Sequence, residues 1–118
     1  MSEYVVLFPA DDEAAWEAGT EADHQRTFDT DLEFGELLKA RGGAVTGGAG
    51  LGDSRKARTI RRGPSSEVLV TEGPFAESAE QLSGFFVVTC DDYDALVEAA
   101  RVLTRAHPVV EIRPVEEF

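Results

Sequence analysis

The sequence predicts an α+β domain on three observations. Tyr4–Phe8 and Gly84–Cys90 are short apolar runs of strand-forming residues. Each run is followed by a helix-like segment with capping signals. The chain has 118 residues, which is enough for one domain with one core. We therefore expect a single domain over residues 1–118, in which helices and strands alternate.

The first helix is expected from Thr20 to about Arg41. Thr20 and Asp23 are typical of a capping pair, and Gly42–Gly43 provides the left-handed exit that ends many helices. The acidic segment before this helix, ADDEAAWEAG, is expected to form a loop or a short helix. The apolar stripe expected to face the sheet consists of Phe28, Leu32 and Leu38, with Leu37 alongside.

The second half of the chain predicts a hairpin, a second helix and a last strand. Arg58–Arg62 and Glu67–Thr71 flank the turn residues GPSS and should pair as a hairpin. Asp91 or Asp92 caps the second helix, and His107–Pro108 ends it. A glycine-rich strand, AVTGGAGL, precedes the hairpin, and VVEIRPV forms the last strand. The stripe of the second helix consists of Tyr93, Leu96, Val97, Ala100 and Leu103.

Two helices interleaved with at least four strands favour a ferredoxin-like sandwich, in which both helices cover one face of an antiparallel sheet. The strands, however, are apolar on both faces. In the first strand Tyr4, Val6 and Phe8 point one way, whereas Val5 and Leu7 point the other. An apolar face of this size should not stay exposed to water. We therefore expect a homodimer whose sheets pack face to face.

The composition excludes several classes of function. The formal net charge is −12, and so acidic a surface repels phosphate backbones, so we expect no nucleic-acid partner. The single cysteine, Cys90, excludes an internal disulfide and fits a reducing compartment. No basic leader precedes the N-terminal apolar run, and no stretch reaches the roughly 18 apolar residues of a membrane span. We expect a cytoplasmic protein with no membrane partner.

Familiar cofactor and metal signatures are missing. The run Gly47–Gly52 lacks the third glycine of a dinucleotide fingerprint. The two histidines lie 83 positions apart, so we expect neither a cofactor nor a metal site. Five of the eleven basic residues lie within Arg55–Arg62. We interpret them as a solvated hairpin whose charges block edge pairing, with an anion-binding patch as the alternative. Cys90 and His107 are interpreted as structural, the first as a buried apolar residue and the second as a cation near a helix end.

His24 and Glu72 are the candidate catalytic residues. His24 lies four residues before Phe28 and so shares the stripe expected to face the sheet. A histidine there could exchange a proton in a pocket, and the alternative is a core histidine bonded to a backbone carbonyl. Glu72 precedes the turn Gly73–Pro74, where its carboxylate either reaches a pocket or braces the turn. Phe75 is expected to fill the core beside it.

The segment VTEGPFAESAEQLSGFFVV, Val70–Val88, resembles the T-D-G-P-F-A-E…E…G-[YF]-[YF] signature of the DGPF branch of the YCII-related family. The N-terminal YVVLF, His24, GGAGL at Gly47–Leu51 and EIRPV at Glu111–Val115 follow in the family's order, so the resemblance covers nearly the whole chain. Glu72 stands where the branch usually has aspartate. Its carboxylate is one methylene further from the backbone, which favours a structural or binding role over a strict catalytic one.

The resemblance implies a dimeric α/β barrel built from ferredoxin-like protomers, with a histidine and an acidic residue near a pocket. Genes of the DGPF branch often lie beside those of sigma factors of the extracytoplasmic type. The resemblance therefore also implies an accessory or regulatory role with a sigma factor as a partner.

Two functions follow, and whether the protein is an enzyme stays open between them. The first is binding of a small molecule between helix and sheet. The second is a cofactor-free isomerase or lyase, in which His24 moves a proton on a small cyclic or aromatic substrate and Glu72 fixes the tautomer. A weaker third is a protein partner that approaches the basic hairpin. The residues expected to contact the ligand are Phe28, Gly48, Gly73 and Phe75.

Overall fold

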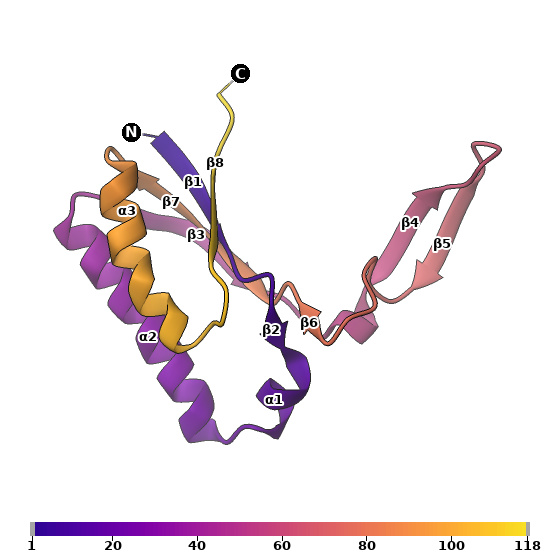
Figure 1. The fold of residues 1–118 in the computed structure, drawn as a ribbon, viewed down its shortest axis with the longest axis horizontal. Helices are drawn as coiled ribbons and strands as arrows, with labels where there is room; N and C mark the ends of the chain where they lie inside the picture. Colours follow the sequence, from indigo (N-terminus) through magenta and orange to yellow (C-terminus); the bar gives the residue numbers. More distant parts are fainter. Residues whose placement is uncertain (1, 118) are drawn as a thin grey trace.

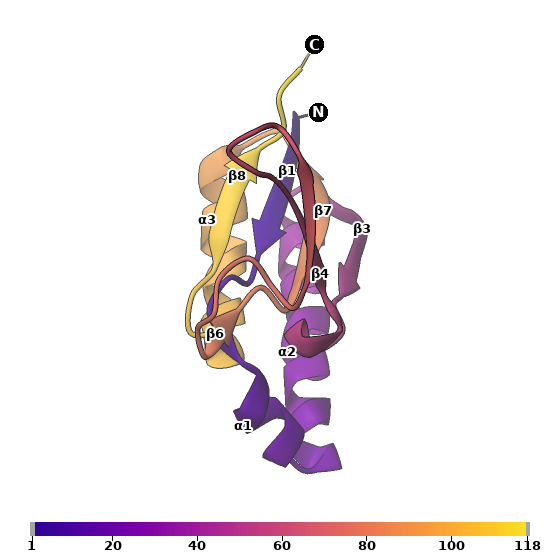
Figure 2. The same ribbon diagram turned by 90° about the vertical axis from the view of Figure 1, so that its right-hand side faces the viewer.

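The computed structural model describes residues 2–117 and confirms the α+β class (Figure 1). Its centre is a four-stranded antiparallel sheet with the order β3-β7-β1-β8. Two helices lie behind one face of this sheet in the view of Figure 2. The strands and helices of this layer are β1 (Ser2–Leu7), α2 (Glu21–Ala40), β3 (Ala44–Gly50), β7 (Gly84–Cys90), α3 (Tyr93–Ala100) and β8 (Glu111–Pro114).

The remaining elements lie at one end of the sheet or beyond it. The 3₁₀ turn η2 directly continues the C-terminal end of α3. The predicted hairpin is present and stands apart from the sheet (Figure 1). These elements are β2 (Asp11–Asp12), α1 (Glu13–Ala18), η1 (Ser54–Lys56), β4 (Arg58–Arg62), β5 (Val68–Glu72), β6 (Glu80–Gln81) and η2 (Arg101–Arg105).

The start and end of α2 follow the sequence signals. The Thr20 side chain accepts a hydrogen bond from the backbone of Asp23, and the Asp23 carboxylate accepts one from the backbone of Thr20. The backbone hydrogen bond from Thr20 holds the pKa of Asp23 below its ordinary value. At the other end Gly42 has φ of 85°, which is the left-handed exit that glycine adopts without strain.

The face that α2 turns to the sheet differs from the expected one. Phe34 and Leu38 are fully buried, but Phe28 is 51% exposed and Leu32 is 68% exposed. Asp31 lies three residues before Phe34 and Thr27 lies four residues before Asp31, so both share the face of Phe34. Both are half-buried. The inner stripe of α2 is therefore polar in its first half. The prediction of an apolar stripe through Phe28 and Leu32 was wrong because it assumed an apolar neighbour along the whole helix.

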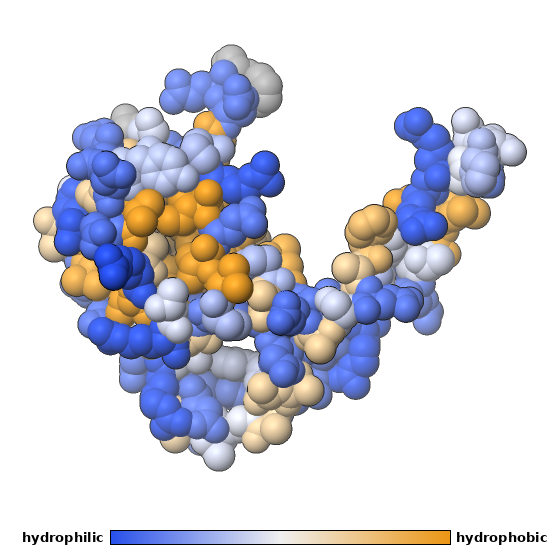
Figure 3. Space-filling view, in the orientation of Figure 1, coloured by the Kyte–Doolittle hydropathy of each residue, from blue (hydrophilic) through white to orange (hydrophobic). Residues whose placement is uncertain are grey.

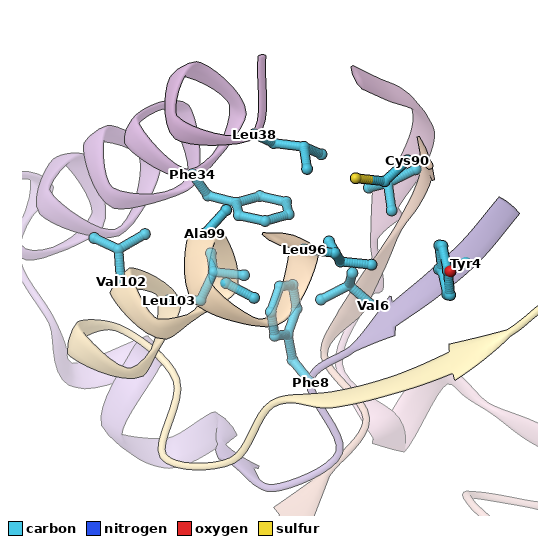
Figure 4. Close-up of a cluster of buried hydrophobic side chains, with 12 residues drawn as sticks. Tyr4, Val6, Phe8, Phe34, Leu38, Cys90, Leu96, Ala99, Val102 and Leu103 are labelled. Carbon is cyan, nitrogen blue, oxygen red and sulfur yellow. The ribbon is translucent and has the colours of Figure 1, made fainter. Parts of the chain in front are cut away.

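The core lies between the helices and the sheet. In Figure 4 side chains from α2, α3 and η2 point toward Val6 of β1 and toward Phe8 just beyond it. Tyr93 and Val97 of the predicted α3 stripe are more than a third exposed, because the buried face of the helix passes through Leu96, Ala99 and Ala100 instead. Cys90 is buried as expected. The core residues are Tyr4, Val6, Phe8, Phe34, Leu38, Val88, Cys90, Leu96, Ala99, Ala100, Val102 and Leu103.

Gly48 in β3 has a conformation and a position that other residues would not tolerate. Its φ is 144°, and a Cβ atom there would lie 2.4 Å from the carbonyl oxygen of Phe85. We expect Gly48→Ala to lower the free energy of unfolding by about 1–3 kcal/mol, measured by urea titration. Gly50 is the matched control, because a Cβ there meets nothing within 4 Å. Equal losses in Gly48→Ala and Gly50→Ala would contradict this close approach of β3 to β7.

Within residues 2–117 the structure contains no helix with the length and hydrophobicity needed to cross a membrane.

Candidate functional site

A pocket of about 650 Å³ lies where α1, α2 and β3 meet the ends of β1 and η2. This volume is in the range of small-molecule sites, roughly 300–1,000 Å³. The antiparallel course of the chain explains the location. The end of β1, the first half of α2 and the end of η2 all reach the same end of the sheet (Figure 1). The aromatic side chains that line the pocket are Phe8, Trp16, Phe28, Phe85 and Phe86.

His107 is the polar centre of this pocket. Its Nδ1 lies 2.9 Å from Oδ2 of Asp11, and its Nε2 lies 3.2 Å from Oδ1 of Asp31. The ring stacks on Phe8 with 3.7 Å between the centroids, and the residue is buried. Three separate elements meet here. Asp11 follows the end of β1, Asp31 comes from the polar inner stripe of α2, and His107 follows η2.

The two carboxylates favour the protonated form of His107. Ionised carboxylates only accept hydrogen bonds, so both ring nitrogens donate when both acids are charged. Burial on its own would lower the pKa of His107. The hydrogen bonds to Asp31 and Asp11, with the negative charges of these groups, outweigh burial and raise the pKa above its ordinary value. The two carboxylates therefore favour an imidazolium at this position in the pocket.

This raised pKa predicts how stability depends on pH. The folded chain holds the His107 proton more tightly than the unfolded chain does. The resulting stabilisation is fully present below the unfolded pKa, near 6.5, and is lost as the pH rises through the folded pKa. We expect the urea midpoint, followed by Trp16 fluorescence, to fall across that window. The same series in His24→Gln removes the second histidine from the measurement. A midpoint that stays level or rises above pH 6.5 would contradict the ion pairs.

The two carboxylate oxygens of Asp11 differ in their hydrogen bonding. Its Oδ2 accepts hydrogen bonds from Ser83 Oγ and from His107. Its Oδ1 is buried and has no hydrogen-bond partner within residues 2–117. The short pairing of β2 with β6 fixes this position, because Asp11 lies opposite Gln81 in that pair. Asp12 has a different task, since it caps α1 by accepting from the backbone of Ala15. A buried acceptor without a donor is unusual in a native protein.

One wall of the pocket is held by contacts between α1 and η1. The Glu13 carboxylate accepts hydrogen bonds from the backbone and the hydroxyl of Ser54, at 2.8 and 2.7 Å. Arg55 donates to Glu17 at 2.6 Å and to Asp53 at 2.8 Å. Asp53 accepts hydrogen bonds from both the side chain and the backbone N–H of Arg55. These two bonds hold the pKa of Asp53 well below its ordinary value. The acidic residues of this wall are thus already paired within the wall.

Comparison with known proteins agrees with the sequence signature. The model of the YCII-related domain matches residues 3–118. The chain belongs to the YCII-related family. It is also 32% identical over 106 residues to an uncharacterised protein of Rhizobium meliloti (strain 1021), a match that covers 87% of this chain and 84% of that protein. The narrower assignment to the DGPF branch stays a prediction.

In this YCII-related protein His24 lies outside the pocket. Its Nε2 is 2.7 Å from the carbonyl oxygen of Trp16, and its ring stacks on the Trp16 indole at 3.8 Å. These contacts tie the start of α2 to α1, and no carboxylate is within hydrogen-bonding distance of His24 in the described chain. Trp16 in turn meets Phe28 edge-on at 5.9 Å, and both rings line the pocket. His24 therefore positions an aromatic wall of the pocket.

Glu72, Gly73 and Phe75 lie away from the pocket. Glu72 is the last residue of β5 and pairs across the hairpin with Arg58. Gly73 has φ of 100° and donates its N–H to the carbonyl of Ala57, which closes the base of the hairpin. Phe75 is 79% exposed, so the expectation that it fills the core was wrong. The turn ends the hairpin and continues into a loop along the surface, which leaves Phe75 without a core to enter.

Of the residues expected to contact a ligand, Phe28 and Gly48 line the pocket. Asp11, Asp31 and His107 were missed. The pair Asp11–Asp12 after the first strand was a usable signal. One acid is enough to cap the following helix, so the other was available for a site. His107 was interpreted as a cation near a helix end, and only the folded chain brings it to Asp11, 96 positions away. Within residues 2–117 no group of three or more acidic, histidine or cysteine side chains is arranged to hold a metal ion.

Proposed function

We propose that this YCII-related protein binds a small, flat, neutral or cationic molecule that donates a hydrogen bond to Asp11. The observation that carries the proposal is Asp11, which lines the pocket and whose buried Oδ1 has no donor within residues 2–117. A ligand N–H or O–H directed at this oxygen would satisfy it. Trp16 and Phe28 would enclose the flat part of the ligand, because both rings line the same pocket.

The charge of the pocket restricts the ligand further. Five carboxylates line the pocket, whereas His107 and Arg55 supply only two positive charges beside them. The pocket therefore has a negative field that repels an acidic ligand. The carboxylates that line it are Asp11, Glu13, Glu17, Asp31 and Asp53.

Three probes that share one phenol ring test this proposal. Tyramine has a cationic tail, tyrosol a neutral tail and 4-hydroxyphenylacetate an anionic tail. We expect the first two to bind and the third to bind at least tenfold more weakly, as measured by ligand-observed NMR. In Asp11→Asn the affinity for tyramine should fall about tenfold or more, since a hydrogen bond to a charged group is worth about 1.5–3 kcal/mol. Asp29→Asn, on the exposed side of α2, is the control. Binding of all three probes with equal affinity, or an unchanged affinity in Asp11→Asn, would contradict the proposal.

A second candidate function is proton transfer without a cofactor, with Asp11 rather than His24 as the base. It is favoured by the arrangement of Asp11, whose Oδ2 is held by Ser83 and His107 while Oδ1 stays free. A carboxylate fixed on one oxygen presents the other to an acidic C–H of a bound substrate. His107 is then placed to supply a proton nearby.

Solvent exchange separates the two candidates. Small cyclic ketones and enols would be incubated with the protein in deuterated buffer, and deuterium incorporation would be followed by NMR. Catalysis that is lost in Asp11→Asn and kept in His24→Gln would support proton transfer. Exchange no faster than in buffer would leave binding as the function, and equal exchange in wild type and Asp11→Asn would exclude Asp11 as the base.

We also propose that the protomer is a ferredoxin-like sandwich that pairs with a second copy through the helix-free face of its sheet. Two cross-strand pairs of apolar residues support this. Val5 lies opposite Val87, and Leu7 lies opposite Phe85. All four are only half-buried although they occupy the two central strands. A second sheet packed on this face would cover them.

A further inference from the structure

The β4–β5 hairpin, residues 58–72, forms an arm that projects from the body of the protein. Figure 1 shows the arm at the far side of an open space from the sheet, and Figure 3 shows that side chains do not fill this space. The radius of gyration is 16.4 Å, whereas a compact chain of this length has about 13–14 Å. An isolated two-stranded hairpin is marginally stable in water, so the arm needs a further surface to pack on.

One face of the arm is apolar at its centre. Ile60 lies directly opposite Val70, and Val68 follows on the same face opposite Arg62. The exposed fractions are 71% for Ile60, 61% for Val70 and 72% for Val68. Figure 3 shows apolar side chains along the arm among the charged ones. Exposed aliphatic residues gathered on one face of a ribbon indicate a contact surface.

The charge of the arm is opposite to that of the rest of the chain. Residues 58–72 hold three of the eleven basic residues and two of the 23 acidic ones, so the arm carries +1 and the remainder carries −13. Within residues 2–117 Arg58, Arg61 and Arg62 make no ion pair, whereas Arg55 is paired with Asp53 and Glu17. The acidic body of a second copy is therefore a complementary partner for the arm.

The space beside the arm borders the helix-free face of the sheet. In Figure 2 the arm lies in front of the sheet and the helices lie behind it, and in Figure 1 the helices and the arm lie on opposite sides of the strands. The apolar face that contains Val5, Leu7, Phe85 and Val87 thus opens toward the space that the arm borders. A second copy seated there would cover the sheet face and the arm together.

We propose that the arm clasps a second copy of this chain, which enters the space between the arm and the helix-free sheet face. The interface is reciprocal, because a two-fold dimer uses the same surfaces of both copies. The arm of each copy then contacts the acidic body of the other with Ile60, Val68 and Val70, and its arginines meet carboxylates. This goes beyond the pairing of sheets alone, since it assigns a partner to the arm.

Substitutions on the two faces of the arm test the clasp. Val70→Asp places a charge on the apolar face, and Thr71→Asp places the same charge one residue further on the opposite face. Sedimentation of the full chain should give a dimer for wild type and for Thr71→Asp, and a dissociation constant at least tenfold higher for Val70→Asp. Arg62→Glu, which removes no apolar contact, should weaken the dimer as well and reduce its dependence on salt.

Cross-linking locates the contact independently of stability. A photoreactive residue at position 70 in a mixture of ¹⁴N and ¹⁵N protein should give cross-linked peptide pairs of mixed isotope. A dimer of unchanged affinity in Val70→Asp, or cross-links within single copies only, would overturn the clasp while leaving face-to-face pairing of the sheets intact. A wild-type monomer at micromolar concentration would overturn both. Circular dichroism of each variant shows whether the body is folded, and tyramine binding reports separately on the pocket.

Discussion

Replacing His107 with alanine should lower the free energy of unfolding by about 3–5 kcal/mol at pH 6, because it leaves two half-buried carboxylates without their shared partner. Asp11 and Asp31 have side chains that are 19% and 23% exposed. They would face each other across the space that the ring had filled. The stacking of the ring on Phe8 is lost as well. Urea unfolding followed by circular dichroism measures the loss.

The matched control is His24→Ala. This histidine also stacks on an aromatic ring and bonds to an oxygen, but its partner is the backbone carbonyl of Trp16 and the site is partly exposed. We expect a loss below about 1.5 kcal/mol. Tyramine binding should be abolished in His107→Ala and reduced less in His24→Ala. Equal effects of the two substitutions would show that the ion pairs of His107 contribute nothing.

Replacing Phe34 with alanine should have an effect of similar size on stability, a loss of about 3–5 kcal/mol. Phe34 is fully buried in the core between α2 and the sheet (Figure 4), and its ring stacks near Phe86 at 5.9 Å. Leu32→Ala, on the same helix and 68% exposed, should change stability by about 0.5 kcal/mol or less. The contrast tests the orientation of α2 directly. A larger loss in Leu32→Ala than in Phe34→Ala would restore the stripe expected from the sequence.

The elements of the fold could be predicted from local signals, whereas the faces of the helices could not. The cap at Thr20, the glycine exit at Gly42 and the run Gly84–Cys90 depend on residues close in sequence, and the structure agrees within one or two residues. Which side of α2 is buried depends on what lies beneath it. Beneath its first half lies the pocket, so Asp31 takes a position that an apolar residue would occupy over a continuous core.

The candidate site was predicted only in part for a related reason. Phe28 and Gly48 line the pocket as expected, but the charged centre joins residues from three elements. Asp11 is one of 23 acidic residues, and the composition does not distinguish it from the others. The spacing of residues around His107 does not indicate a role in a pocket. The burial of Asp11 and the opposed positions of the two carboxylates across the imidazole arise only when β1, α2 and η2 converge. The family signature, in contrast, marks the base of the arm at Glu72–Phe75.

The most direct test of these ion pairs is an NMR titration of the His107 ring in ¹⁵N-histidine-labelled His24→Gln protein, which contains a single histidine. We predict that the pKa of His107 lies above 6.5, that both ring nitrogens are mostly protonated at pH 6, and that Asp31→Asn lowers this pKa. A ring that titrates below pH 6.5, or that carries one proton at pH 6, would contradict an imidazolium held between Asp11 and Asp31.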